Sequence, residues 1–130
     1  MNRRPRLALT QGDPAGIGPE ILLKLLASAA ALAPREPSWE PLVVAERAAL
    51  EPLRPILPHV SDIPWDRFRY LSSLPSREEL EALDGIPVLD PVGEPRALAF
   101  GESGPADAAG AMAALDAGIA LVRSGAADAL

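Results

Sequence analysis

The sequence predicts an α/β fold with a mainly parallel sheet, and three observations support this prediction. Short apolar segments alternate with longer segments whose apolar residues recur at helical spacing. Gly and Pro residues separate many of these segments, as they do at turns. The length of 130 residues corresponds to about one domain. Strands and helices that alternate in this way form a mainly parallel sheet.

The first predicted element is a strand over residues 6–10, and a helix follows it after a short loop. Gly18 is the expected N-cap of this helix, with Pro19 at the first position and Glu20 in the first turn. We expect the helix to end before Pro34. Its apolar residues at helical spacing are Ile21, Leu22, Leu25, Leu26 and Ala29.

The middle of the chain contains shorter elements. Residues 41–45 suit a second buried strand, and residues 46–53 suit a short helix that ends before Pro55. Residues 55–75 are Pro-rich, although the alternation of Phe68 and Tyr70 is compatible with a strand there.

Two further elements follow residue 75. Residues 76–83 suit a helix in which Ser76 and Glu79 have the spacing of a capping box. Residues 86–91 predict a strand, with Pro87 near its start or on a sheet edge.

A long helix is predicted from Pro105 to about Arg123, after a loop over residues 92–103. Residues 125–130 have the composition of a turn that leads into another strand. We therefore expect residues 1–130 to be the amino-terminal α/β portion of a longer polypeptide, without an internal domain boundary. A compact chain that is complete at residue 130 is the alternative. The long helix has an apolar stripe that we expect to face the core, formed by Met112, Leu115, Ile119 and Val122.

Composition and charge argue against several classes of protein. The net charge of -6 disfavours a nucleic-acid partner, which needs clustered Lys and Arg. The absence of Cys rules out disulfides and thiolate metal sites, which is compatible with a cytoplasmic location. No apolar stretch reaches the roughly 20 residues of a membrane span. A secretory signal fits poorly, because Asp13 and Glu20 separate the basic start from the first apolar run.

The segment "GDPAGIGPE", residues 12–20, is the candidate binding motif. Glycines allow positive φ and let a ligand approach the backbone, and the start of a helix offers free N–H groups with partial positive charge. A strand, a Gly-rich turn and a helix start together suit an anion or a nucleotide. The motif is neither G-x-G-x-x-G nor a P-loop, and Asp13 and Glu20 would repel phosphate unless they reach a cation or a hydroxyl group. A tight structural turn, with Glu20 favouring the helix dipole, is the alternative.

The longer run "LTQGDPAGIGPEI" resembles the amino-terminal signature of the 4-hydroxythreonine-4-phosphate dehydrogenase family, and it is more distantly similar to the "GDGIGPE" turn of isocitrate and isopropylmalate dehydrogenases. The segments "VVAE" (43–46), "IPVLDP" (86–91) and "FGESGPADAAGAMAALDAGIALVRSGAADAL" (100–130) also resemble that family. Around residues 101–110 the chain departs from the family's usual loop pattern, which has a Gly near the position of Ala108. No substrate role is therefore assigned to residues 101–110. The resemblance implies a three-layer α/β/α fold of the isocitrate and isopropylmalate dehydrogenase type, incomplete in this chain.

The resemblance also implies an activity in vitamin B6 (pyridoxal phosphate) biosynthesis. Members oxidise 4-phosphooxy-L-threonine with NAD or NADP to a 3-oxo acid, which decarboxylates to 3-amino-2-oxopropyl phosphate. A divalent metal ion (Zn, Mg or Co) bound by histidines polarises the hydroxyl group, and the enzyme is a homodimer with sites at the subunit boundary. By analogy with the related dehydrogenases, the cofactor-binding residues are Gly12, Asp13, Gly16, Ile17 and Gly18, with Ile17 against the adenine.

His59 is the only histidine of the chain, and its context does not match the family's metal motifs. A metal site needs three or four ligands. We therefore expect the metal ligands, and the family's phosphate-binding His-Thr pair, to lie beyond Leu130, and we assign no catalytic residue to this chain. Two alternatives stay open. One is a dehydrogenase for threonate or erythronate 4-phosphate, and the other is a non-catalytic chain that binds a nucleotide.

Overall fold

A computed structural model describes residues 3–31, 38–57 and 62–130, and it contains a sheet of four parallel strands. The strands are β1 (Arg6–Thr10), β2 (Glu40–Val44), β3 (Phe68–Leu71) and β4 (Ile86–Leu89), in the spatial order β1-β2-β4-β3. All three strand pairs are parallel, so the predicted α/β class is confirmed. The prediction of a strand around Phe68 and Tyr70 is also confirmed, and this strand forms one edge of the sheet.

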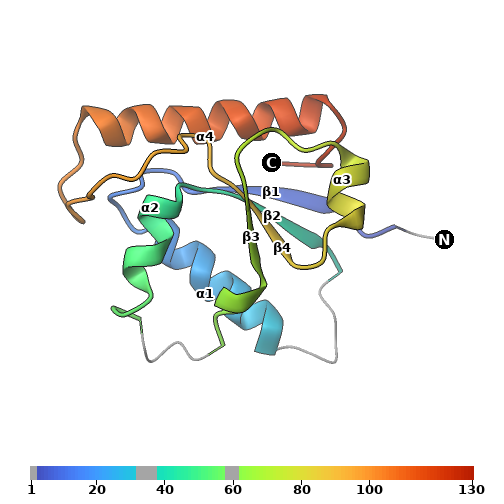
Figure 1. Ribbon diagram of the computed structural model, residues 1–130, viewed down its shortest axis with the longest axis horizontal. Coiled ribbons are helices and arrows are strands. Elements are labelled where there is room, and N and C mark those ends of the chain that lie inside the picture. The colour runs from blue at the N-terminus through green and yellow to red at the C-terminus, as the bar shows by residue number, and fades with distance from the viewer. Residues whose placement is uncertain (1–2, 32–37, 58–61) are drawn as a thin grey trace.

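Helices cover both faces of the sheet and create three layers (Figure 1). On one face lie α1 (Gly18–Ala31) and α2 (Arg47–Leu50), and on the other lies α4 (Pro105–Arg123). A further helix, α3 (Arg77–Ala82), precedes β4 and has the predicted capping box between Ser76 and Glu79. Two 3-10 helices complete the set, η1 (Glu51–Leu53) directly after α2 and η2 (Trp65–Arg67) directly before β3.

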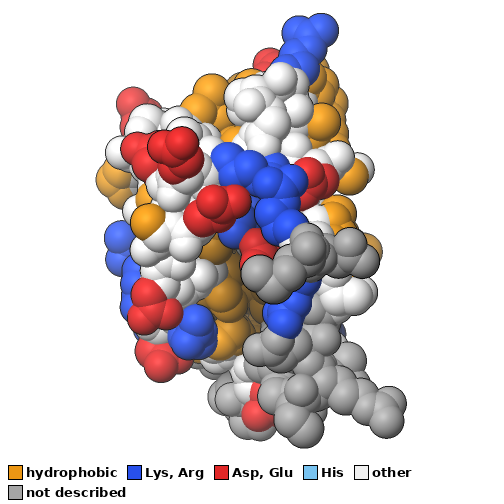
Figure 2. All heavy atoms as spheres, turned by 90° about the vertical axis from the view of Figure 1, so that its right-hand side faces the viewer, with side chains coloured by type: hydrophobic (Ala, Val, Ile, Leu, Met, Phe, Trp, Pro, Cys, Tyr) orange, Lys and Arg blue, Asp and Glu red, His pale blue; other side chains and the backbone are white. Residues whose placement is uncertain are grey.

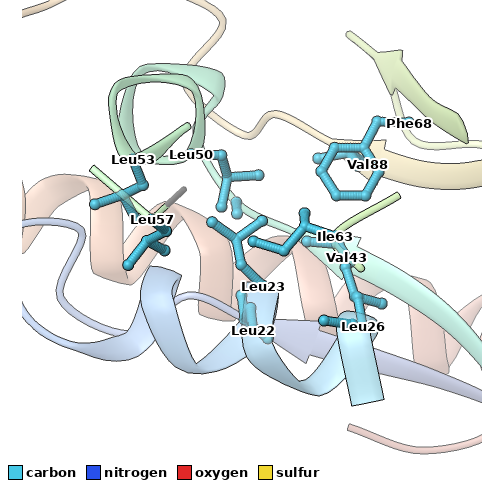
Figure 3. Close-up of a cluster of buried hydrophobic side chains, with 12 residues drawn as sticks. Leu22, Leu23, Leu26, Val43, Leu50, Leu53, Leu57, Ile63, Phe68 and Val88 are labelled. Atoms are coloured by element: carbon cyan, nitrogen blue, oxygen red, sulfur yellow. The ribbon is translucent and has the colours of Figure 1, made fainter. Parts of the chain in front are cut away.

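The core between the sheet and α1 is built from aliphatic side chains of both layers (Figure 3). Leu22, Leu23 and Leu26 of α1 pack there, while Ile21 and Leu25 are 53% and 37% exposed. The spacing of these apolar residues correctly predicted the helix, of which Leu22 and Leu26 face the core and Ile21 and Leu25 do not. The sheet contacts a narrower face of the helix than its apolar residues cover. Pro34, expected to follow the end of this helix, lies outside the described residues.

The core on the opposite face lies beneath α4. The predicted apolar stripe of this helix is right at Val122, which packs against this core, and wrong at Met112, Leu115 and Ile119. Small residues of α4 face the sheet together with Leu121, whereas Met112 is 56% exposed, Leu115 39% and Ile119 40%. Gly110 shows the reason, because a Cβ atom there would lie 2.5 Å from Oε2 of the buried Glu46. The backbone of α4 therefore approaches the sheet closely at its small residues, and Leu121 fills the core farther along the helix. The residues of α4 that are buried are Asp107, Gly110, Ala114, Gly118 and Leu121.

Among the described helices, α4 alone is long and apolar enough to cross a membrane, with a mean hydropathy of 1.3 over its most apolar window. A single helix of this kind is weak evidence for a membrane span, because helices that pack against a core have the same composition. Here α4 lies along the sheet and contacts β1 and β2.

Two features of the sheet refine the predictions. Pro87 is the second residue of β4, near the start of the strand as expected, although β4 is an inner strand and not an edge. Pairing of β4 with β2 begins only at Val88, so the missing N–H group of Pro87 precedes that part of the ladder. The strand approach predicted over residues 125–130 is present as a parallel bridge between Leu7 and Ala129.

Candidate functional site

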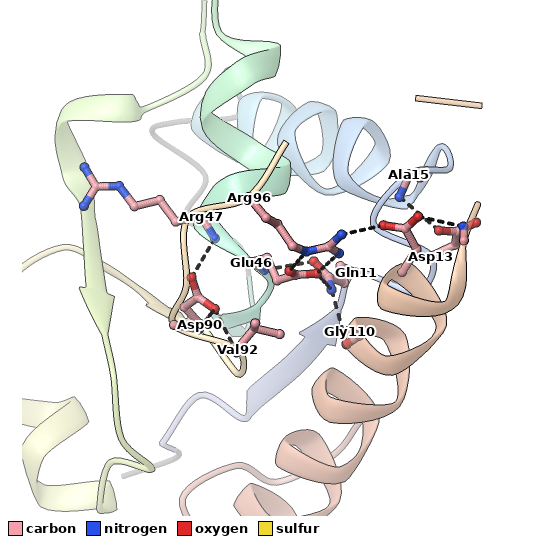
Figure 4. Close-up of polar contacts among 12 residues, drawn as sticks. Gln11, Asp13, Ala15, Glu46, Arg47, Asp90, Val92, Arg96 and Gly110 are labelled. Atoms are coloured by element: carbon pink, nitrogen blue, oxygen red, sulfur yellow. Dashed lines mark hydrogen bonds and ion pairs between the residues drawn. The ribbon is translucent and has the colours of Figure 1, made fainter. Parts of the chain in front are cut away.

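The candidate site lies at the carboxyl ends of the parallel strands, where polar residues follow three neighbouring strands. Gln11 follows β1 by one residue, Glu46 follows β2 by two, and Asp90 follows β4 directly. The carboxyl ends of parallel strands share one edge of the sheet, and ligands of open α/β sheets bind at that edge. Figure 4 shows these residues side by side.

The loop between β1 and α1 is a tight turn held by Asp13. One carboxylate oxygen of Asp13 accepts a hydrogen bond from the N–H of Ala15 at 2.9 Å, and its carbonyl accepts from the N–H of Gly16 at 3.0 Å. Gly12 has a φ of 66°, in the left-handed region that favours glycine. Gly18 is required by close packing, because a Cβ atom there would lie 1.8 Å from the carbonyl oxygen of Gln11.

A second loop, just before α4, holds this turn in place. The N–H of Gly101 donates to the carbonyl of Ala15 at 2.8 Å, and the hydroxyl of Ser103 donates to the carboxylate of Asp13. Segments about 90 residues apart in the sequence therefore form one surface. This loop falls in the region to which no substrate role was assigned.

The five predicted cofactor-binding residues form one short surface segment. Gly12 and Asp13 are exposed, Gly16 and Gly18 are partly buried, and Ile17 is 71% exposed. Nothing lies within 4 Å of the position where a Cβ atom of Gly12 would stand, so space is open there. The loop can therefore offer backbone groups and one apolar side chain to a flat ligand.

Beneath the loop lies a buried polar pair that sequence reasoning missed. The side-chain amide of Gln11 donates to Glu46 Oε2 at 3.0 Å, and the backbone N–H of Glu46 donates to Gln11 Oε1 at 2.8 Å. Gln11 is 1% exposed and Glu46 is 0% exposed. Buried polar groups of this kind need hydrogen-bond partners, and each residue supplies one for the other. The available signal was a polar residue within two positions after each of two strands.

Arg96 completes this network and compensates the buried charge of Glu46. Its Nε and Nη2 lie 2.7 Å and 3.0 Å from the two carboxylate oxygens of Glu46, a bidentate contact. Its Nη1 donates to Asp107 at 2.8 Å, near the start of α4. These hydrogen bonds, led by the one to Glu46, raise the pKa of Arg96 despite its partial burial. The pKa of Asp107 is lowered, first by the backbone N–H of Gly104 and then by Arg96.

A pocket of about 460 Å³ opens beside Arg96, between α2 and the loop after β4. Asp90 shapes this pocket, because its carboxylate accepts from the backbone N–H groups of Arg47 at 3.0 Å, Val92 at 2.9 Å and Gly93 at 2.7 Å. The wall of the pocket carries both signs of charge. Its charged residues are Arg47, Glu51, Asp90, Glu94 and Arg96.

The described residues do not fit a metal ion. Among residues 3–31, 38–57 and 62–130, no three His, Asp or Glu side chains come together as a metal site would require. His59 lies outside the described residues, so the structure does not test the prediction that it binds no metal. No chemical step is assigned to a metal ion in this part of the molecule.

Comparisons with known proteins point to one family. No family model matches the chain. A 24-residue segment is 83% identical to a 4-hydroxythreonine-4-phosphate dehydrogenase of Synechococcus sp. (strain JA-2-3B'a(2-13)), covering 18% of this chain and 7% of that protein. A 66-residue segment is 38% identical to the protein of the same name from Desulfosudis oleivorans, covering 49% of this chain and 19% of that protein.

Solved structures show the same similarity over nearly the whole chain. A 4-hydroxythreonine-4-phosphate dehydrogenase from Burkholderia phymatum superposes with a TM-score of 0.69 at 24% identity, over 97% of this chain and 35% of that one. A protein from Salmonella typhimurium, described as a putative enzyme of the same name, gives a TM-score of 0.66 at 27% identity, over 95% of this chain and 35% of that one. The fold is thus that of part of these proteins, of which the chain spans about a third.

Proposed function

We propose that this chain belongs to the 4-hydroxythreonine-4-phosphate dehydrogenase family and forms the nucleotide-facing portion of an NAD(P)-dependent dehydrogenase, as its similarity to proteins of that name supports. The observation that carries the proposal is the Asp13 turn at the carboxyl edge of the sheet, which leaves Gly12, Asp13 and Ile17 exposed. In open α/β sheets this edge is where ligands bind.

The proposed reaction is the oxidation of 4-phosphooxy-L-threonine. The carbon of the secondary alcohol loses a hydride to the nicotinamide, and its hydroxyl group loses a proton, which gives a 3-oxo acid. The bond to the carboxylate then breaks and CO₂ leaves, while the electron pair forms an enolate that is protonated to 3-amino-2-oxopropyl phosphate. The bound NAD or NADP supplies the hydride acceptor.

Within this proposal, the residues of this chain bind and orient the cofactor. Ile17 offers an apolar contact to the adenine, and the backbone at Gly12, Gly16 and Gly18 allows close approach. Asp13 already accepts a hydrogen bond from the hydroxyl of Ser103, so its carboxylate is suited to a hydroxyl group and not to phosphate.

The proposal places the remaining machinery outside residues 1–130. The ligands of a divalent metal ion (Zn, Mg or Co) and the phosphate-binding groups would come from polypeptide beyond Leu130. Residues 1–130 would then be the amino-terminal portion of a cytoplasmic homodimer.

The assay that tests the activity uses the full-length protein with a divalent metal ion and either cofactor. We expect reduction of NAD or NADP with 4-phosphooxy-L-threonine, and release of CO₂. A preference for threonate or erythronate 4-phosphate would reassign the substrate within the same chemistry. Reduction with none of the three substrates, together with retained NAD binding, would favour a non-catalytic nucleotide-binding role.

A substitution at Ile17 tests the cofactor wall directly. Ile17→Ser should weaken NAD or NADP binding about fivefold, because an apolar contact worth about 1 kcal/mol is lost. Since Ile17 is 71% exposed, the free energy of unfolding should change by less than about 0.5 kcal/mol. Leu74→Ser is the matched control, because Leu74 is 55% exposed and lies after β3. Calorimetric titration measures the affinity of both variants for NAD or NADP. Equal affinities would show that Ile17 does not contact the cofactor.

A further inference from the structure

A pocket of about 450 Å³ lies at the opposite edge of the sheet, where the strands begin. Its apolar floor includes Leu80, Leu83 and Ile86. Figure 2 views this side of the molecule and shows basic side chains gathered at the centre, with acidic ones around them. The charged residues that line the pocket are four arginines and two glutamates, namely Arg3, Arg6, Arg67, Arg77, Glu40 and Glu81. The lining is therefore positive in a chain whose net charge is -6.

Arg6 is the unusual member of this group. It is 7% exposed, and of its three guanidinium nitrogens only Nη2 has a partner among residues 3–31, 38–57 and 62–130, namely Glu40 at 2.5 Å. Its Nε and Nη1 are shielded from solvent and have no hydrogen-bond partner. The Nε of Arg77 is likewise buried without a hydrogen bond. A buried donor without an acceptor is destabilising. Within the part of the chain that the structure describes, three guanidinium nitrogens of this pocket therefore lack an acceptor.

The ion pairs around the pocket fall into two groups. Short contacts hold the buried Arg6 and the partly buried Arg77, since Arg6 pairs with Glu40 and Arg77 with Asp128 at 2.7 Å. Glu81 makes only long contacts, 3.9 Å to Arg3 and 3.8 Å to Arg77.

The contact at Arg67 is also long. It lies 3.6 Å from Asp84, whose side chain is 95% exposed. Contacts beyond about 3.5 Å are too long for hydrogen bonds. Arg67 and Glu81 are therefore held loosely, whereas Arg6 and Arg77 are held by short contacts and Arg3 pairs with Asp128 at 3.3 Å.

We propose that this pocket binds a small oxyanion of the phosphate class. Phosphate offers several acceptor oxygens, which can pair with the unsatisfied donors of Arg6 and Arg77. It would take the place of the loosely held Glu81 beside Arg3, and Arg67 would add long-range attraction from the rim. The proposal is independent of the dehydrogenase activity, because it rests on residues at the other edge of the sheet.

The test is a titration of the protein with inorganic phosphate at constant ionic strength, with sodium chloride as the reference salt. Nitrogen-15 NMR reports the Nε–H signals of arginine side chains. We expect the signals of Arg6 and Arg77 to shift on one saturable curve with phosphate and not with chloride. The absence of a saturable shift, or an equal effect of chloride, would overturn the proposal.

Three variants test this site further. One should weaken the binding of phosphate, one should strengthen it, and one should leave it unchanged. Arg67→Gln should weaken binding about threefold, because an exposed charge at the rim is lost. Glu81→Gln should strengthen binding about threefold, because a competing carboxylate is removed. Arg54→Gln, an exposed site after α2, should change nothing. Equal weakening by Arg67→Gln and Arg54→Gln would show that phosphate responds only to total charge, which would contradict a defined site.

Discussion

At the scale of single residues, the glycines of the loop after β1 have different physical roles although the sequence presents them alike. Gly12 adopts a left-handed φ, and Gly18 lies against the backbone of Gln11. The backbone at Gly16 is compatible with a side chain, because its φ is not positive and a Cβ atom there would lie 3.4 Å from Asp13, an ordinary van der Waals distance. The pattern predicts a turn, whereas only the packing shows which glycine the turn requires.

A pair of alanine substitutions separates these roles. Gly18→Ala should lower the free energy of unfolding by about 3 kcal/mol, because the added carbon would overlap the carbonyl oxygen of Gln11 and displace backbone. Gly16→Ala should change it by less than about 0.5 kcal/mol. Urea unfolding of the two variants measures the difference. Similar losses in both variants would show that the loop is uniformly intolerant of side chains.

At the scale of elements, α4 shows how burial can oppose hydropathy. Its largest apolar residues form a stripe that stays partly exposed, and its small residues face the sheet. Close approach of the helix backbone to the sheet explains this choice, because a Cβ atom at Gly110 would lie 2.5 Å from the carboxylate of the buried Glu46 and one at Gly118 would lie 3.1 Å from Thr10. Hydrophobic periodicity identified the helix correctly and its buried face wrongly.

Truncation of two aliphatic residues on α4 tests this assignment. Leu121→Ala should cost about 3 kcal/mol, because Leu121 is 0% exposed and a cavity would remain. Ile119→Ala should cost less than about 1 kcal/mol, because Ile119 is 40% exposed. Both values follow from urea unfolding of the purified variants. A larger loss for Ile119→Ala would mean that the stripe predicted from the sequence is buried after all.

At the scale of the whole molecule, Asp128 joins the two ends of the described chain. Its carboxylate accepts from the backbone N–H of Arg6 at 2.7 Å and from the guanidinium of Arg77 at 2.7 Å. These contacts, the first one foremost, lower the pKa of Asp128 below its ordinary value of 3.8. They also place Ala129 beside Leu7, where the parallel bridge forms.

The lowered pKa of Asp128 predicts a pH dependence of folding stability. A carboxylate whose pKa is lower in the folded state stabilises the fold above its unfolded pKa and loses this effect as the pH falls through the folded pKa. Asp128→Asn should therefore destabilise the protein at pH 6, and its difference from the natural sequence should shrink below about pH 4. Denaturant unfolding at both pH values measures this difference. A difference that stays constant with pH would show that the carboxylate charge of Asp128 is not involved.

The sequence by itself determined the order and type of most elements and the parallel α/β class, because strand and helix periods and capping residues are local properties. Its "GDPAGIGPE" turn also pointed to the family that we propose. It also located the carboxyl-edge loop that we propose as the cofactor wall. It could not reveal that Gln11, Glu46, Arg96 and Asp107 form one network, nor that Arg6 is buried with unsatisfied donors. Those facts depend on which segments meet, and residues up to 125 positions apart meet only through the sheet order and the close approach of α4. Tertiary packing decided them, because the cost of a buried charge depends on the partners that surround it.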